Sequence, residues 1–435
     1  MTTLLQVPFE QQYIEQFSKS KNEPAWMISL RKEGLELAGS LPLPEPDKTN
    51  INRWDFVQGE HQVAADTINS IDDLPEALHD FVDKENVSEN LIILRNQVPA
   101  YQTISDELVE QGVIFTDIFT ALQEHEELVK KYYMTDAVQI NEHNLTALHA
   151  ALMNGGVFVY VPENVQIDEP LQAIFWQENE AAALYNHVIV VAEKDSSVTY
   201  VENYVSNNTT KKATANIVSE VFAHENANVS YGAVDHFAEG MITYVNRRGV
   251  AYDYATLNWA LGQMNEGNTI AENVTMLEGE NALSYPRTVT VGKTKQIQNF
   301  TTTTHHSGRG TDGQILQRGV LLGKTTAIFN AIGKIEHGAS GSNAEQESRI
   351  LMLSGDARGD ANPILLIDED DVTAGHAASV GRIDEMQVYY LQSRGLTKEQ
   401  AEQLIIHGFL APVVEALPIE TIRNQMIQLI EGKIS

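Results

Sequence analysis

A short phrase recurs through the middle of this chain. It consists of a small or polar, an apolar, a polar and an aromatic residue, and it occupies Ser197–Tyr200, Asn228–Tyr231, Thr256–Trp259 and Ala282–Tyr285. The apolar members of successive phrases are 31, 28 and 26 residues apart. Repeats of this length without helical insertions are typical of a parallel β-helix, whose coils stack short strands on one another. The phrase therefore predicts a mainly β fold.

Segments that resemble strands surround the repeats. They are β-branched and aromatic, are separated by acidic, Asn or Gly turns, and include residues 157–161, 187–192, 197–201 and 288–292. Polar runs such as Thr301–Thr304 are suited to stacking as ladders between coils. A β-sandwich is the alternative, because strands every 8–12 residues fit that fold also. The repeat spacing favours the β-helix.

The pattern divides the chain into three regions. Residues 1–150 are predicted to be a helix-rich N-terminal region, residues 151–385 the parallel β-helix core, and residues 386–435 a C-terminal helical region. In the tail, Thr397 and Gln400 have capping-box spacing. From the pattern alone, this tail either caps the end of the β-helix or docks a partner.

The first region is mixed in character. Aromatic and aliphatic residues at helical spacing precede residue 50, and Leu91–Asn96 resembles a strand. Helices are predicted around Asp106–Lys131 and Asp136–Met153.

The charge balance of the 435 residues excludes several partners. The chain has 29 basic and 60 acidic residues, a formal charge of −31, and no Lys/Arg cluster. Nucleic acid and anionic membranes would repel such a chain. No apolar run approaches the ~18 residues of a membrane span, and the first residues lack a basic segment followed by an apolar one. We expect a cytoplasmic protein.

The chain has no cysteine. It therefore forms no disulfide and offers neither a thiolate nucleophile nor a thiolate metal ligand. Chemistry with soft metals would have to use histidines and carboxylates of this chain, or thiolates of a partner.

Several motifs resemble ligand sites without meeting their requirements. Gly308–Gly313 has the G-x-G-x-x-G spacing, but a strand rather than a helix is predicted to follow it. Gly319–Thr325 is one residue shorter than a phosphate-binding loop. His305 and His306 would point to opposite faces of a strand. Asp368–Asp371 is predicted to be a solvated turn.

One histidine stands out. His376 follows an apolar strand and the four acids, and its neighbours Gly375, Ala377 and Ala378 are too small to cover an imidazole. A single histidine is more often structural than functional, but this one is predicted to be accessible. The competing function class is a free-standing β-helix that binds or cleaves polysaccharide. Such an enzyme needs clustered carboxylates, and the carboxylates of this chain lie mostly in predicted turns.

The segment from about residue 329 to 417 resembles the SufB/SufD family of iron–sulfur cluster assembly proteins. The matching residues are Phe329-Asn330, Gly333–Ile335, Gln346, Leu351–Leu353, Ala357-Arg358, Pro363, Ile367–Val372, His376, Val380–Asp384, Tyr390-Leu391, Ser393–Leu396 and Gly408-Phe409. Nearer the N-terminus, Glu23–Trp26, Arg31 and residues 41–44 also fit.

The resemblance implies a right-handed parallel β-helix between helical regions. It also implies a non-catalytic scaffold in a complex with a SufB-like paralogue and two copies of a SufC-like ABC-type ATPase, which docks on the C-terminal helices. A cysteine desulfurase system would be an indirect partner. Apart from the resemblance, an uncovered edge of the β-helix would invite pairing and allow a homodimer in isolation. The chain would bind no cofactor tightly by itself.

His376 falls on the family position implicated in cluster assembly. The resemblance implies that it would hold iron or a transient iron–sulfur cluster together with partner thiolates. Some relatives have a cysteine where this chain has Ala374 and a glycine where it has Ala377. A mechanism that needs a thiol from this subunit therefore does not fit. The missing cysteine also places the chain with the family member that does not supply the cluster thiolate.

Overall fold

A computed structural model of the chain describes residues 5–79, 81–82, 88–207, 212–417 and 420–434. Its strands form two long sheets. The ten-stranded sheet contains, in spatial order, β2 (Val98–Thr103), β1 (Leu91–Arg95), β5 (Leu171–Gln177), β7 (Ser197–Ser206), β9 (Asn228–His236), β11 (Thr256–Gln263), β13 (Leu283–Gly292), β15 (Asp312–Leu321), β17 (Asn343–Met352) and β19 (Thr373–Gly381).

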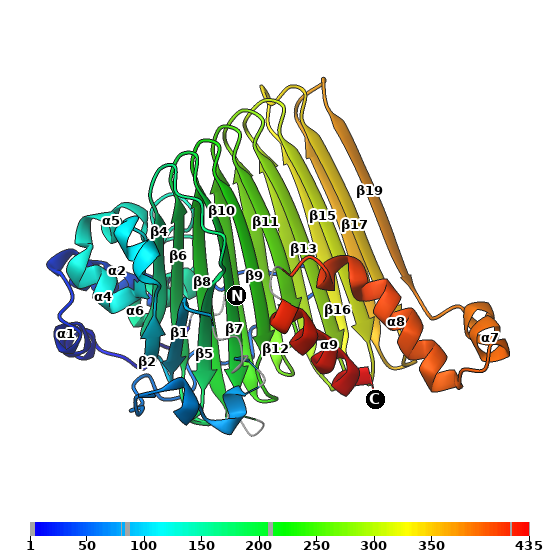
Figure 1. Cartoon of the computed structure of the whole chain (residues 1–435), viewed down its shortest axis with the longest axis horizontal. Coiled ribbons are helices and arrows are strands. Elements are labelled where there is room, and N and C mark those ends of the chain that lie inside the picture. Colours follow the sequence, from blue (N-terminus) through cyan, green and yellow to red (C-terminus); the bar gives the residue numbers. More distant parts are fainter. Residues whose placement is uncertain (1–4, 80, 83–87, 208–211, 418–419, 435) are drawn as a thin grey trace.

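The second sheet has nine strands. In spatial order they are β3 (Ile114–Asp117), β4 (Gly155–Val161), β6 (Leu184–Ala192), β8 (Ala213–Ala223), β10 (Met241–Ala251), β12 (Asn268–Leu277), β14 (Ile297–His306), β16 (Thr326–Ile335) and β18 (Arg358–Ile367). From β4 onward the chain alternates between the sheets, and neighbouring strands within each sheet are parallel. This arrangement confirms the parallel β-helix, and the β-sandwich alternative, which requires antiparallel sheets, is wrong. Figure 1 shows the coils stacked from β4 at one end to β19 at the other.

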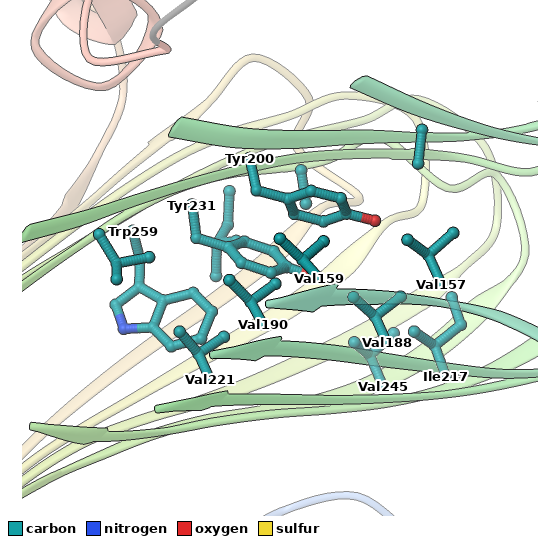
Figure 2. Close-up of a cluster of buried hydrophobic side chains, with 14 of the residues drawn as sticks. Val157, Val159, Val188, Val190, Tyr200, Ile217, Val221, Tyr231, Val245 and Trp259 are labelled. Carbon is teal, nitrogen blue, oxygen red and sulfur yellow. The ribbon is translucent and has the colours of Figure 1, made fainter. Parts of the chain in front are cut away.

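The hydrophobic core fills the lumen between the sheets. Labelled valines of the nine-stranded sheet face Tyr200, Tyr231 and Trp259 of the ten-stranded sheet (Figure 2). These three aromatic residues belong to the repeated phrase, and their ring centroids are 5.3 Å and 4.9 Å apart along the stack. The repeat in the sequence therefore records an aromatic ladder inside the solenoid.

The fourth phrase is out of register with the other three. Leu257 pairs with Ser284, and Trp259 pairs with Pro286, so Leu283 and Tyr285 lie on the outer face. Because side chains alternate along a strand, a shift of one residue moves each of them to the opposite face. The fourth phrase therefore does not continue the core ladder.

Helices lie beside the first coils of the solenoid (Figure 1), and most of them pack on the outer face of the nine-stranded sheet. They are α1 (Gln11–Ser20), α2 (Ala25–Ser40), α3 (Asp106–Glu110), α4 (Ile118–Glu124), α5 (Glu126–Tyr132) and α6 (Asn144–Leu152), with 3₁₀ turns at Ile71–Asp73 and Glu76–Leu78. The prediction of helix across 106–131 is wrong in its middle. There β3 pairs antiparallel with β4 and so begins the second sheet.

The N-terminal helices pack tightly against one another. A Cβ on Gly34 of α2 would lie 2.7 Å from the carbonyl oxygen of Ala147, so a glycine permits the close approach of α2 and α6. Buried Arg31 donates from Nε to Glu23 Oε2 at 2.7 Å and from Nη1 to the carbonyl of Ala151 at 3.1 Å. These contacts fasten α2 to α6.

Three helices follow the last strand: α7 (Glu385–Ser393), α8 (Lys398–Val414) and α9 (Glu420–Ile434). The predicted capping box is present, since Thr397 Oγ1 accepts from the amide of Gln400 and Gln400 Oε1 accepts from the amide of Thr397. Helices α8 and α9 pack on the outer face of the ten-stranded sheet (Figure 1). Gly262 makes room there for Met426 of α9. The tail therefore lies along the side of the solenoid rather than over its end.

Candidate functional site at the open end of the solenoid

His376 lies on β19, the last strand of the ten-stranded sheet. Among the described residues, β19 pairs only with β17, and β18 at the end of the other sheet pairs only with β16. Most of β19 is exposed, His376 included. The predicted accessibility of this histidine is confirmed, although its cause is the end of the stack as well as the small neighbours.

The register places the His376 side chain on the lumen side of the final coil. His376 pairs with Gln346, which is buried and points inward. Residues 374, 378 and 380 share its face by strand alternation. A Cβ added to Gly359 of β18 would lie 3.2 Å from Val380 Cγ1, which shows that this face of β19 looks across at β18. No hydrogen bond or ion pair joins the His376 side chain to another described residue.

The backbone of β19 presents an unpaired edge. The amide of Thr373 donates to the carbonyl of Ser342 at 2.9 Å, so the odd-numbered residues of β19 bond to β17. In a parallel strand, the alternate residues direct their N–H and C=O groups to the opposite side. Here these residues are Ala374, His376, Ala378 and Val380. Such an edge is a template for pairing with another chain.

The four acids before β19 form the turn that was predicted. Glu369 Oε2 accepts from the amide of Gly338 at 2.8 Å, and Asp371 Oδ2 accepts from Ser340 Oγ at 2.8 Å. The amides of Gly338 and Asp370 lower the pKa of Glu369. His337 Nδ1 lies 3.6 Å from Glu369. These side chains join the last two coils to each other.

The other candidate motifs have structural roles. His306 faces the lumen, where burial lowers its pKa to about 4 and Nδ1 lies 2.8 Å from Thr311 Oγ1. His305 faces outward, with Nε2 2.8 Å from Glu336. Gly308–Gly313 is the turn before β15 with the first two residues of that strand, and Gly319–Thr325 is the end of β15 with the turn before β16. Within the described ranges no three His, Asp or Glu side chains gather as a metal site.

Sequence reasoning missed two buried polar clusters. In the lumen, Arg247 donates to Asp235 at 2.7 Å and 2.9 Å and to Glu202 at 3.0 Å and 3.2 Å. All three side chains are almost fully buried. Burial raises the pKa of Glu202, and the Arg247 charge opposes that shift. The sequence did carry a signal for this cluster, because β7, β9 and β10 each place one charged residue at an inward-facing position.

The second cluster joins the helical cap to the outer face of the nine-stranded sheet. Asn216 Nδ2 donates to the carbonyl of Leu145, so its Oδ1 accepts from His149 Nδ1 at 3.1 Å. His149 Nε2 must then accept from His187 Nδ1 at 3.0 Å, and His187 Nε2 must accept from Glu220 at 2.9 Å. Burial raises the pKa of Glu220 to about 8. We therefore assign a protonated Glu220 as the donor at the end of this chain.

The C-terminal helices carry large apolar side chains that face solvent. Met386, Tyr389 and Tyr390 of α7 and Leu404 of α8 are all exposed. Figure 1 shows α7 projecting beyond the solenoid. Exposed apolar groups gathered in this way are typical of an interaction surface. No described helix combines the length and the apolar character needed to cross a bilayer.

Comparison with known proteins identifies the class to which this fold and open edge belong. Residues 175–409 match the family described as SUF system FeS cluster assembly, SufBD core domain, and residues 67–173 match the SufBD protein N-terminal region. The chain belongs to the SufB/SufD family of iron–sulfur cluster assembly proteins.

Within that family the chain is of the SufD type. It is 53% identical to the iron–sulfur cluster assembly protein SufD of Bacillus subtilis strain 168, over 100% of both chains. It is also 28% identical to an iron–sulfur cluster assembly SufBD family protein of Staphylococcus aureus strain USA300, over 97% of this chain and 93% of that one. Membership of the family favours iron–sulfur cluster assembly over the polysaccharide alternative.

Proposed function

We propose that this chain is a non-catalytic scaffold subunit of a cytoplasmic, ATP-driven iron–sulfur cluster assembly complex. The observation that carries the proposal is the unpaired edge of β19, with His376 on it, at an end of the solenoid that the C-terminal helices leave uncovered. A SufB-like paralogue with a matching solenoid end would pair with this edge and extend the sheet across the interface.

Iron and sulfide are the substrates of the assembly and would meet at this interface. An imidazole is a suitable iron ligand. Because the chain has no cysteine, the thiolates must come from the partner, and sulfur would reach the site through a cysteine desulfurase system that acts on that partner. His376 at the mouth of the final coil could face both the partner and the lumen.

The C-terminal helices would dock a SufC-like ATPase. The exposed residues of α7 offer an apolar patch, while α8 and α9 are anchored to the ten-stranded sheet by their buried faces. A movement of the ATPase would therefore be transmitted to β13 and β15 through α8, and from there to the coil that carries His376.

Replacing Ala378 by proline tests the role of the edge. The N–H of residue 378 points away from β17, so proline removes a donor from the free edge without removing a ladder bond to β17. We expect the variant to fold but to lose its one-to-one complex with the SufB-like partner when the two chains are co-expressed and sized.

The matched control is Ala378→Val, which adds side-chain volume but keeps the N–H. We expect this variant to form the complex. If the proline variant co-purifies with the partner as the wild type does, the edge of β19 is not the interface and the proposal fails.

A further inference from the structure

A continuous groove crosses the outer face of the ten-stranded sheet. Its floor follows a row of residues that the strand register places side by side: Ala260, Arg287, Leu316, Glu347 and Ala377. Two hollows of about 400 Å³ and 280 Å³ share Tyr285 and Arg287 and so join into one groove. Ala416, just after α8, contributes to the wall.

A second row runs parallel to the first, two residues further back along each strand. Asn258 pairs with Tyr285, and Gln314 pairs with Glu345, which in turn pairs with Gly375 of β19. Tyr285 lies in this groove because of the shift in register at the fourth repeat. The floor therefore combines polar and charged side chains with small or apolar ones, which are Ala260, Leu316, Gly375 and Ala377.

The groove contains one charge of each sign without a partner. No described residue forms a salt bridge with the side chain of Arg287 or of Glu345, whereas Glu347 forms salt bridges with Arg318 and Arg349. Arg287 is half-buried, and no described acceptor bonds to its guanidinium. A ligand that supplies a carboxylate to Arg287 and a cation to Glu345 would satisfy both charges.

The dimensions of the groove select the class of ligand. It runs from β9 to β19, which is five inter-strand steps of about 4.8 Å, or about 24 Å. Arg287 on β13 and Glu345 on β17 are two inter-strand steps apart and are also offset by two residues along the strand direction, so their Cα atoms are separated by about 12 Å. An extended polypeptide advances about 3.3 Å per residue and alternates its side chains between two faces, so residues four apart span about 13 Å and present both side chains to the groove.

We propose that this groove binds an extended segment of another polypeptide that carries an acidic and a basic side chain four residues apart. The segment lies across the strands, with its carboxylate on Arg287 and its cation on Glu345, and the amide and hydroxyl groups of the floor contact its backbone. A neutral oligosaccharide of the same length would leave both charges of the groove unpaired. The groove reaches the outer face of β19 beside His376, but its two charges lie on β13 and β17, so this inference does not rest on the proposed function.

The test uses the full chain and fluorescein-labelled Gly/Ser decapeptides. Each peptide carries one Asp and one Lys, spaced one, four or seven residues apart, and binding is followed by fluorescence anisotropy at low salt. We expect saturable binding that is about tenfold tighter for the four-residue spacing than for the other two. Arg287→Ala should weaken that binding about tenfold, and Arg309→Ala, at an exposed arginine outside the groove, should leave it unchanged.

A charge exchange gives the sharpest discrimination. Arg287→Glu alone should abolish binding, whereas Arg287→Glu combined with Glu345→Arg should restore it, because the same peptide can then lie in the opposite direction. Equal binding of all three spacings, no saturable binding, or no effect of Arg287→Ala would each overturn the proposal. Cellohexaose that binds saturably and independently of Arg287 would overturn it in favour of a carbohydrate ligand.

Discussion

Replacing Arg247 by alanine is expected to destabilise the centre of the solenoid by about 3–5 kcal/mol. The Arg247 side chain is 1% exposed and bonds to two carboxyl groups, those of Glu202 and Asp235, that are fully buried in the lumen. Without it, these carboxylates must take up protons or draw water into a closed core. Urea unfolding followed by circular dichroism measures the loss.

The control separates charge from packing. Arg247→Met combined with Glu202→Gln and Asp235→Asn keeps the volume but removes every charge, and we expect it to recover most of the lost stability, because neutral groups can replace a buried ion cluster. Arg309→Ala, on an exposed turn, should be neutral. A loss below about 1 kcal/mol for Arg247→Ala would show that the ion cluster does not stabilise the lumen.

The second large effect is a loss of stability in mild alkali through Glu220. The pKa of this carboxyl is about 8 in the folded chain, against an ordinary value of 4.5, so the folded state holds the proton more tightly. This contribution to stability is complete below pH 4.5 and is lost as the pH rises through 8. Between pH 6.5 and 8.5 we expect a loss of about 2 kcal/mol, measured by urea unfolding at both values.

The histidines of the same chain act in the opposite direction. Burial lowers the pKa of His187 to about 3 and that of His149 well below 6.5, so their contribution is lost as the pH falls below 6.5. Glu220→Gln keeps a donor towards His187 and cannot ionise. It should remove about 2 kcal/mol of the difference between pH 6.5 and 8.5, although one of the two amides now bonded to Glu220 loses its acceptor. An unchanged pH dependence in this variant would contradict the assignment of a protonated Glu220.

The fold could be predicted because its signal repeats. The aromatic members of three phrases stack in the lumen, and each coil reinforces the same alternation. The fourth phrase shows the limit of such a pattern. Ala282–Tyr285 has the same residue types, yet the length of the turn before it shifts the register by one, and hydrophobicity alone does not report that shift.

The candidate site was predictable only in part. Small neighbours made His376 recognisable as accessible, but its direction depends on its pairing with Gln346, and its exposure depends on β19 being last in the stack. Both are properties of the assembled coils. The ion cluster around Arg247 was hidden for a similar reason, since its members are up to 45 residues apart in sequence and meet only across the lumen.

The measurement that tests the central claim most directly is anaerobic cluster reconstitution on the co-purified complex of this chain with its SufB-like and SufC-like partners. Wild type is compared with His376→Ala by visible absorption and by iron and sulfide content. We predict that the variant assembles the complex but loses the cluster, because a ligand at the β19 edge is missing. An intact complex with an unchanged cluster yield would contradict this role of His376 and would leave the chain a scaffold alone.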